Sequence, residues 1–165
     1  MKSIKIKELQ INPFQMLNKE WALVAAGTAE NFNAMTISWG SMGVLWNKPT
    51  ITIYVRPQRY TKEFIDNEEY FTVSFFKSNY KKALNTLGTK SGRDLDKIKE
   101  AGLTTTFTNS VIFNEAYLTF VCKKSYCQRM DPINFIDETV DATWYPQKDH
   151  HFTYHGEIVE VLVNE

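Results

Sequence analysis

Three basic side chains and a hydroxyl lie close together in one short stretch of this sequence. Arg56, Arg59 and Lys62 are separated by only a few positions, and Thr61 precedes the last of them. Guanidinium groups bind phosphate oxygens in a bidentate geometry, and a hydroxyl or the first amides of a helix add neutral donors. The stretch therefore predicts a phosphate-binding site in which Arg59 and Thr61 are the principal members. The alternative is a solvated basic turn whose charge Glu63 partly neutralises.

A second set of candidate residues is the group of small polar side chains between positions 34 and 40. Apolar side chains alternate there with Thr36 and Ser38, and a period of two is typical of a β-strand. A strand face that carries only small hydroxyls is suited to lie beneath a flat ligand. Met35 and Trp39 can contact an aromatic ring, although such residues are as often buried in a core or an interface. The alternative is an amphipathic strand whose hydroxyls face solvent.

The other residues that could bind a metal or act as nucleophiles form no recognisable catalytic motif. His151 and His155 would lie about 13 Å apart on one strand face, too far for one ion, so we predict no metal site. Cys122 and Cys127 fit neither a redox pair nor a common zinc motif, and we expect two free thiols. The motifs of serine hydrolases, P-loop proteins and dinucleotide-binding Rossmann folds are absent from the sequence.

The elements that must position these residues are mostly short strands. Strands are expected at 3–8, 21–28, 34–40, 50–55, 71–76, 104–107, 111–113, 116–126 and 156–163. Helices are expected at 60–67, from 78 or 79 to Gly88, and from Ser91 to Gly102, whereas 13–17 is expected to be a loop or a single turn and 131–149 to be mostly loop. The basic stretch thus lies between a strand and a helix. This all-β dominated pattern with inserted helices favours a closed or nearly closed antiparallel barrel.

Length and composition fit a single domain over residues 1–165. Hydrophobic residues make up 43% of the chain and aromatic residues 14%, and 19 basic side chains balance 19 acidic ones. The chain lacks the cationic excess that nucleic acid or an anionic membrane requires, so we expect neither as a partner. No apolar run is long enough to span a bilayer, and the first residues do not resemble a secretory signal. We therefore expect a cytoplasmic protein.

Five stretches of the sequence, taken in order, form a recognisable pattern. They are Asn33-Ala34-Met35-Thr36-Ile37-Ser38-Trp39, Arg59-Tyr60-Thr61, Phe71-Thr72-Val73-Ser74-Phe75, Ser91-Gly92-Arg93-Asp94 through Lys97, and His151 five residues before Gly156. Together they resemble the flavin reductase-like family of FMN-binding split-barrel proteins, including the flavoredoxin type, over about residues 21–163. Many members carry Gly-Asp-His or Asp-Tyr-His before the last strand, where this chain has Asp149-His150-His151. Counting back from Gly156 selects His151 as the equivalent residue.

The resemblance implies a fold, an assembly and a cofactor. Family members have a six-stranded antiparallel split β-barrel with Greek-key connections, usually as a homodimer with FMN near the subunit interface. The residues that it implies for FMN binding are Asn33, Ala34, Met35, Thr36, Ser38, Trp39, Arg56, Arg59, Tyr60, Thr61, Ser91 and Gly92. In this interpretation the segment 33–39 hydrogen-bonds the isoalloxazine ring and the basic stretch binds the phosphate. For Ser91 and Gly92, a helix cap beside an Asp94–Lys97 surface pair remains the alternative.

The function implied by the resemblance is that of an FMN-containing flavin reductase-type oxidoreductase. NAD(P)H would deliver hydride to the flavin, and the chain would supply placement rather than an acid or a base. His151 is expected to position the nicotinamide, with His150 as the alternative. The rival interpretations are an FMN-bearing electron carrier reduced by a partner protein and a non-enzymatic barrel that binds another small molecule. Aromatic residues beyond the needs of one small core agree with a homodimer: Trp46, Tyr117, Tyr126 and Trp144.

Overall fold

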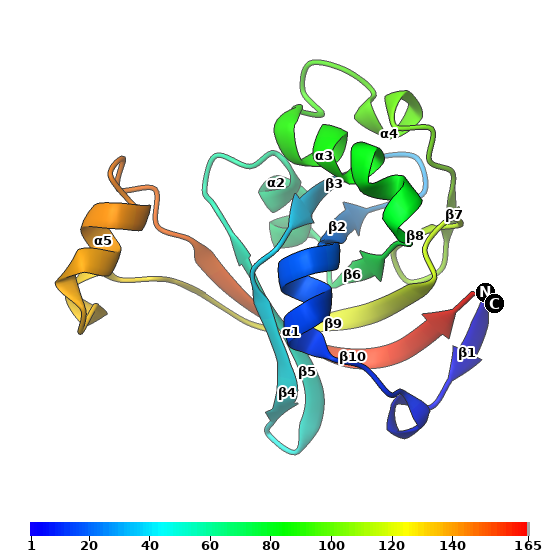
Figure 1. Ribbon diagram of the computed structural model, residues 1–165, viewed down its shortest axis with the longest axis horizontal. Helices are drawn as coiled ribbons and strands as arrows, with labels where there is room; N and C mark the ends of the chain where they lie inside the picture. The colour runs from blue at the N-terminus through cyan, green and yellow to red at the C-terminus, as the bar shows by residue number, and fades with distance from the viewer. Residues whose placement is uncertain (165) are drawn as a thin grey trace.

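The computed structural model describes residues 1–164, which form one large antiparallel sheet with inserted helices (Figure 1). The strand order is β3-β2-β6-β9-β10-β5-β4, and β1 pairs with β10. The strands are β1 (Lys2–Ile4), β2 (Ala22–Gly27), β3 (Phe32–Ile37), β4 (Gly40–Leu45), β5 (Lys48–Val55), β6 (Tyr70–Phe75), β9 (Leu118–Arg129) and β10 (Phe152–Val163). A separate hairpin joins β7 (Thr105–Phe107) to β8 (Val111–Phe113). The predicted split-barrel class is confirmed, although the large sheet has eight strands rather than six.

The alternation of apolar residues places the core where the sequence predicted it. Ile51, Ile53 and Val55 of β5 are buried in the same cluster as Phe71 and Val73 of β6. Side chains two residues apart point to the same face of a strand, so each strand contributes one apolar row to this core. Tyr54 lies on the opposite face of β5 and points toward the functional site described below.

The barrel is split between β3 and β4. These strands are consecutive, but within residues 1–164 β3 pairs only with β2 and β4 pairs only with β5. The short connection through Ser38 and Trp39 therefore crosses an open edge of the sheet. Backbone groups at such an edge lack strand partners and are available to a ligand.

Helix α3 (Lys81–Thr89) covers the outer face of β3. Leu84 and Leu87 pack there in a second apolar cluster that also contains Ala34. Gly88, which we expected to end the helix, lies within it, and a Cβ at this position would be 3.3 Å from the Cβ of Thr36. The missing side chain therefore lets α3 lie close to the strand that carries the predicted ligand-binding residues.

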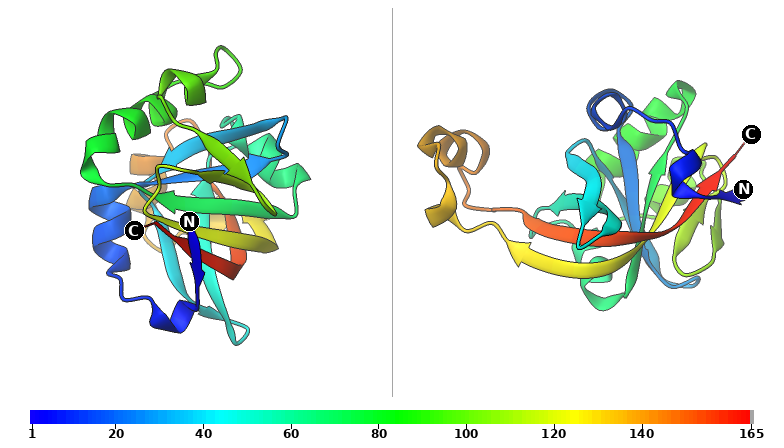
Figure 2. Two further views of the ribbon diagram at one scale, coloured as in Figure 1. Left: turned by 90° about the vertical axis from the view of Figure 1, so that its right-hand side faces the viewer. Right: turned by 90° about the horizontal axis from the view of Figure 1, so that it is seen from below.

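Strands β9 and β10 extend away from the barrel and carry residues 130–151, which we call the arm (Figures 1 and 2). The arm contains α5 (Glu138–Trp144), in a segment that we expected to be mostly loop. The carboxylate of Asp137 accepts a hydrogen bond from the Thr139 amide at 3.0 Å and so caps the helix. The helix has no buried residues, which explains why the sequence shows no apolar period there.

Several further boundaries differ from those predicted. The loop or single turn expected at 13–17 is α1 (Pro13–Gln15) followed by a π-helical turn (Met16–Glu20), and β4 was not predicted. The strand expected at 3–8 is β1 followed by a 3-10 turn (Ile6–Glu8). The helix expected from Ser91 is reduced to α4 (Lys97–Glu100), whereas α2 (Thr61–Asn67) agrees with its prediction within one residue. Among the described helices none is long and apolar enough to cross a membrane.

Candidate functional site

A cavity of about 260 Å³ opens at the split between β3 and β4. It brings together the last residues of β3, the end of β5 and the basic stretch that follows β5. Its lining consists of Met35, Thr36, Ile37, Ser38, Trp39, Tyr54, Arg56, Arg59, Gly88 and His151. Seven of these residues are in the predicted site, so the fold gathers most of the candidates from distant parts of the sequence in one place.

A second cavity of about 520 Å³ adjoins the first, since the two share Ser38, Trp39, Tyr54 and His151. The rest of its lining is Pro13, Phe14, Leu17, Asn18, Gly40, Ser41, Met42, Met130 and Tyr145. None of the described lining residues carries a formal charge apart from a histidine that can titrate. The combined site therefore has a cationic end at the basic stretch and a neutral, largely aromatic end below the arm.

Two cations occupy the C-terminal end of α3. Arg59 donates from Nη1 to the carbonyl of Gly88 at 2.9 Å, and Lys97 donates from Nζ to the carbonyls of Leu87 and Lys90, each at 3.1 Å. Helix C-termini attract cations, so both side chains cap the helix. Within residues 1–164 neither forms an ion pair with a carboxylate. Two positive charges with only carbonyl partners leave local charge that an anion can neutralise.

Burial raises the free-energy cost of keeping Arg59 and Lys97 positively charged. Lys97 is only 3% exposed, and burial, together with repulsion from Arg59, lowers its pKa to about 8. Burial also lowers the pKa of Arg59. A desolvated cation loses favourable water contacts, and a nearby anion restores the charged form. The Asp94–Lys97 surface pair that we considered is wrong, because Lys97 is buried and points to the end of α3.

The other basic residues near the site are already paired. Arg56 contacts Asp149 at 2.5 Å and the carbonyl of Trp144 at 2.9 Å. Lys62 pairs with Asp66 at 2.6 Å, and its ammonium group lies 3.8 Å from the centre of the Phe152 ring. These contacts favour Arg59 over Arg56 and Lys62 as the anion ligand. The carboxylate of Glu63 pairs with Arg93 and not with one of the three basic residues of this stretch.

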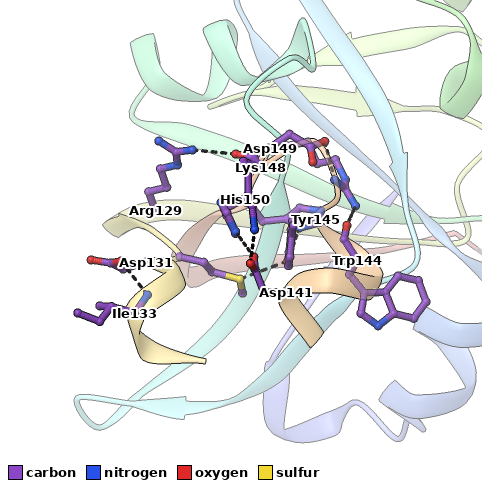
Figure 3. A network of polar contacts seen from close by, with 12 residues as sticks. Arg129, Asp131, Ile133, Asp141, Trp144, Tyr145, Lys148, Asp149 and His150 are labelled. Carbon is purple, nitrogen blue, oxygen red and sulfur yellow. Dashed lines mark hydrogen bonds and ion pairs between the residues drawn. The ribbon is translucent and has the colours of Figure 1, made fainter. Parts of the chain in front are cut away.

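The two neighbouring histidines have different environments. His151 lines both cavities, and its Nδ1 lies 2.8 Å from the hydroxyl of Tyr145. His150 is 1% exposed, stacks on the Tyr145 ring at a centroid distance of 4.7 Å, and contacts Asp141 at 2.5 Å. Figure 3 shows Asp141 between His150 and Lys148. His151 is therefore the histidine that a ligand in the cavities would meet.

Several predicted residues support the site without lining its cavities. The amide of Asn33 donates to the hydroxyl of Thr61 at 2.9 Å, and both side chains are buried. Ala34 packs beneath α3, and Tyr60 packs edge-on against Phe64. Thr36 does line the smaller cavity, but its hydroxyl donates to the Leu84 carbonyl, so it faces α3 and not solvent. Its oxygen can still accept a hydrogen bond.

Ser91 and Gly92 lie on the other side of Lys97. Gly92 lines a separate hollow of about 710 Å³ together with Lys97, and the Ser91 hydroxyl accepts a hydrogen bond from the Arg93 amide at 3.2 Å. A Cβ at Gly92 would be only 2.3 Å from the Oδ1 of Asn33. Gly92 is thus required for the close approach of this turn to the Asn33–Thr61 pair.

Sequence reasoning missed five residues that shape the site: Tyr54, Gly88, Lys97, Met130 and Tyr145. The alternation of β5 could have identified Tyr54, because Ile53 and Val55 point to the core and Tyr54 must point away. No local pattern identifies Tyr145, since the arm brings it to the barrel through tertiary contacts. Among residues 1–164 no group of three histidine, cysteine or acidic side chains is arranged to hold a metal ion. Cys122 and Cys127 are both free thiols, as expected.

The fold and the cavity at its split edge define an antiparallel split-barrel protein. The family model described as "Flavin reductase like domain" matches residues 15–165. The chain therefore belongs to the flavin reductase like domain family. No protein with a curated functional description matches it.

Solved structures with the same fold have low sequence identity to this chain. The flavoredoxin of Methanosarcina acetivorans is 21% identical with a TM-score of 0.70, over 88% of this chain and 69% of that one. An FMN-binding domain of a flavin reductase-like enzyme from Shewanella baltica is 16% identical with a TM-score of 0.69, over 97% and 75%. An NADH:FAD oxidoreductase of Streptomyces globisporus, solved with NAD and FAD fragments, is 14% identical with a TM-score of 0.64, over 88% and 74%.

Proposed function

We propose that this protein is an FMN-binding oxidoreductase of the flavin reductase type, with NAD(P)H as its hydride donor. The observation that carries the proposal is the pair of cations at the C-terminal end of α3: half-buried Arg59, which lines one end of the combined site, and buried Lys97 at the same helix terminus. Arg59 uses one guanidinium N–H on the Gly88 carbonyl, so further donors remain for an anion. A phosphate group at this end would leave the flat part of a flavin over the segment 35–39.

The neutral end of the combined site fits the remaining requirements. Trp39, Tyr54 and His151 line both cavities and offer ring faces and edges for stacking. When bound, FMN accepts a hydride from a reduced nicotinamide and passes electrons onward. The residues of this chain would bind and orient the two rings. Membership of the flavin reductase like domain family supports the same interpretation.

The test begins with the colour of the purified protein. Oxidised flavin absorbs near about 450 nm, so a yellow protein with this band supports cofactor binding. Anaerobic mixing with NADH and, separately, with NADPH should then bleach the band. Bleaching by either nicotinamide supports the reductase. A yellow protein that neither nicotinamide bleaches would be an electron carrier that needs a redox partner protein. A colourless protein that does not take up added FMN would contradict the proposal altogether.

A further inference from the structure

Tyr145 and His151 form a hydrogen-bonded pair at the wall of the larger cavity. The tyrosine hydroxyl lies 2.8 Å from Nδ1 of the imidazole, and both residues are buried. His151 also packs against Trp39 and Tyr54, at centroid distances of 5.5 and 6.4 Å. The ring is thus held from three sides. Its Nε2 has no hydrogen-bond partner within residues 1–164.

The direction of this hydrogen bond determines what His151 can offer to a ligand. Burial lowers the pKa of His151 to about 4, and the positive charge of Arg56 acts in the same direction. At neutral pH the ring therefore carries a single proton. The Tyr145 hydroxyl can donate either to Nδ1 or to the Met130 sulfur, which lies at 3.5 Å. Imidazole nitrogen is the stronger acceptor, so the hydroxyl donates to Nδ1 and the proton stays on Nε2.

The cavity next to this donor favours a neutral, flat molecule. Of its described lining residues none is acidic or permanently cationic, and aromatic side chains form much of its wall. A charged ligand would lose its hydration there without gaining an ionic partner. A carbonyl oxygen on a planar ring would instead accept a hydrogen bond from an Nε2–H group while the ring stacks on aromatic neighbours.

We propose that Tyr145 is a positioning residue that fixes His151 with its proton on Nε2, and that this N–H binds the carbonyl oxygen of a flat, neutral ligand. The proposal rests on the proposed function in one respect: it takes the larger cavity to be the place where a substrate meets the bound flavin. The carbonyl belongs either to the carboxamide of the nicotinamide or to an electron-accepting aldehyde, enone or quinone. Both sources present the same atom to the same donor.

The experiment compares matched ligand pairs on the purified protein, with no turnover required. Benzaldehyde is paired with toluene, and nicotinamide with 3-methylpyridine, so each pair differs in the carbonyl group. Titration by NMR gives the affinity ratio within each pair, and ¹⁵N spectra of the His151 ring report which nitrogen is protonated. The variants are Tyr145→Phe, His151→Leu and the control Tyr80→Phe, which removes a tyrosine hydroxyl that lines neither cavity.

In the unmodified protein we expect a proton on Nε2 and a preference of roughly three- to tenfold for the carbonyl member of at least one pair. Tyr145→Phe should lower that preference and mix the two ring tautomers, His151→Leu should abolish it, and Tyr80→Phe should keep both features. If the protein prefers nicotinamide to 3-methylpyridine, the carbonyl belongs to the hydride donor. If it prefers benzaldehyde to toluene, the carbonyl belongs to an electron acceptor.

Three results would overturn the proposal: a proton on Nδ1 in the unmodified protein, no preference in either pair, or an unchanged preference in Tyr145→Phe. Failure of the proposed function gives a different result. If neither NADH nor NADPH reduces the protein while the carbonyl preference and its dependence on Tyr145 persist, the assignment of Tyr145 and His151 stands without the reductase.

Discussion

Arg59 and Lys97 illustrate how a side chain can have a structural and a binding role at once. Both cap the carbonyl end of α3, and this contact alone would account for their positions. Capping by one cation is common, but burial of Lys97 and its repulsion from the neighbouring Arg59 together lower the pKa of Lys97 to about 8. An anion would relieve this repulsion, whereas a purely structural cap would keep it.

Replacing Arg59 with alanine should separate the two roles. We expect Arg59→Ala to weaken FMN binding by about 1.5–3 kcal/mol, because charge-assisted hydrogen bonds to the phosphate are lost. Riboflavin lacks the phosphate, so its affinity should change little. Fluorescence titration of the apoprotein with both flavins measures this difference. An equal loss for the two ligands would show that Arg59 acts through the fold and not through the phosphate.

The affinity for FMN should also depend on pH through Lys97. The free protein loses the Lys97 proton around pH 8, and a bound phosphate should raise this pKa. Binding above that pH therefore takes up a proton, so affinity should fall as pH rises, by up to about tenfold per unit. The phosphate itself does not titrate there, since its second pKa is about 6. A Lys97→Met variant should bind more weakly and show no such slope between pH 7.5 and 9.5.

At the scale of elements, β10 depends on one position where no side chain fits. A Cβ at Gly156 would lie 2.5 Å from the Phe71 ring and 2.7 Å from the Cys122 Cβ, and both of those residues are fully buried. The register of β10 against β9 shifts next to this residue. The strand thus bends past the core at the point where it passes from the arm to the barrel.

Gly156→Ala should consequently destabilise the protein by about 1–3 kcal/mol, because neighbours with no free space must move. Gly43→Ala in β4 is the matched control. No described atom lies within 4 Å of a Cβ there, so its effect should stay within about 0.5 kcal/mol. Urea unfolding of both variants gives the comparison. Similar midpoints for the two would mean that the Phe71 ring can move aside.

The strands and the site could be predicted to different degrees, for physical reasons. The period of two in β5 and β6 predicted their core faces because each strand buries one row of side chains. Strand β4 was missed because it lies at the edge of the sheet with most of its residues partly or fully exposed, which leaves no apolar alternation. The sequence predicted most residues of the smaller cavity. Tyr145 and the burial of Lys97 depend on contacts between distant segments, which no local pattern records.

At the scale of the whole molecule, we propose a homodimer. Trp46 is 62% exposed and Val44 is 76% exposed near the turn between β4 and β5, and Trp144 on the arm is 50% exposed. The backbone of Trp46 has φ of 51°, an uncommon conformation for a large side chain. Of the four aromatic residues that suggested a dimer, Tyr117 is half-buried rather than exposed, and its hydroxyl donates to Glu20 at 2.6 Å.

Light scattering should give twice the chain mass of 19.2 kDa at micromolar concentration. A stable dimer would bury roughly 2,000 Å² or more in total, which accounts for exposed aromatic residues on both the hairpin and the arm. Trp46→Lys should shift the mass toward the monomer while circular dichroism stays unchanged. A monomer mass for the unmodified protein would contradict the proposal.

The attachment of the arm makes the larger cavity sensitive to ionic strength. Asp149 joins the arm to the barrel through Arg56 at 2.5 Å and Gln58 at 2.7 Å, and these contacts lower its pKa. Salt screens charges over about 10 Å at 0.1 M and about 3 Å at 1 M. Because Tyr145 is carried by the arm, concentrated salt should weaken the binding even of an uncharged ligand, about two- to threefold for a partly buried pair. In Asp149→Asn that affinity should already be low and nearly independent of salt. The arm would therefore make ligand access depend on ionic strength, although the described lining of the larger cavity carries no acidic or permanently cationic side chain.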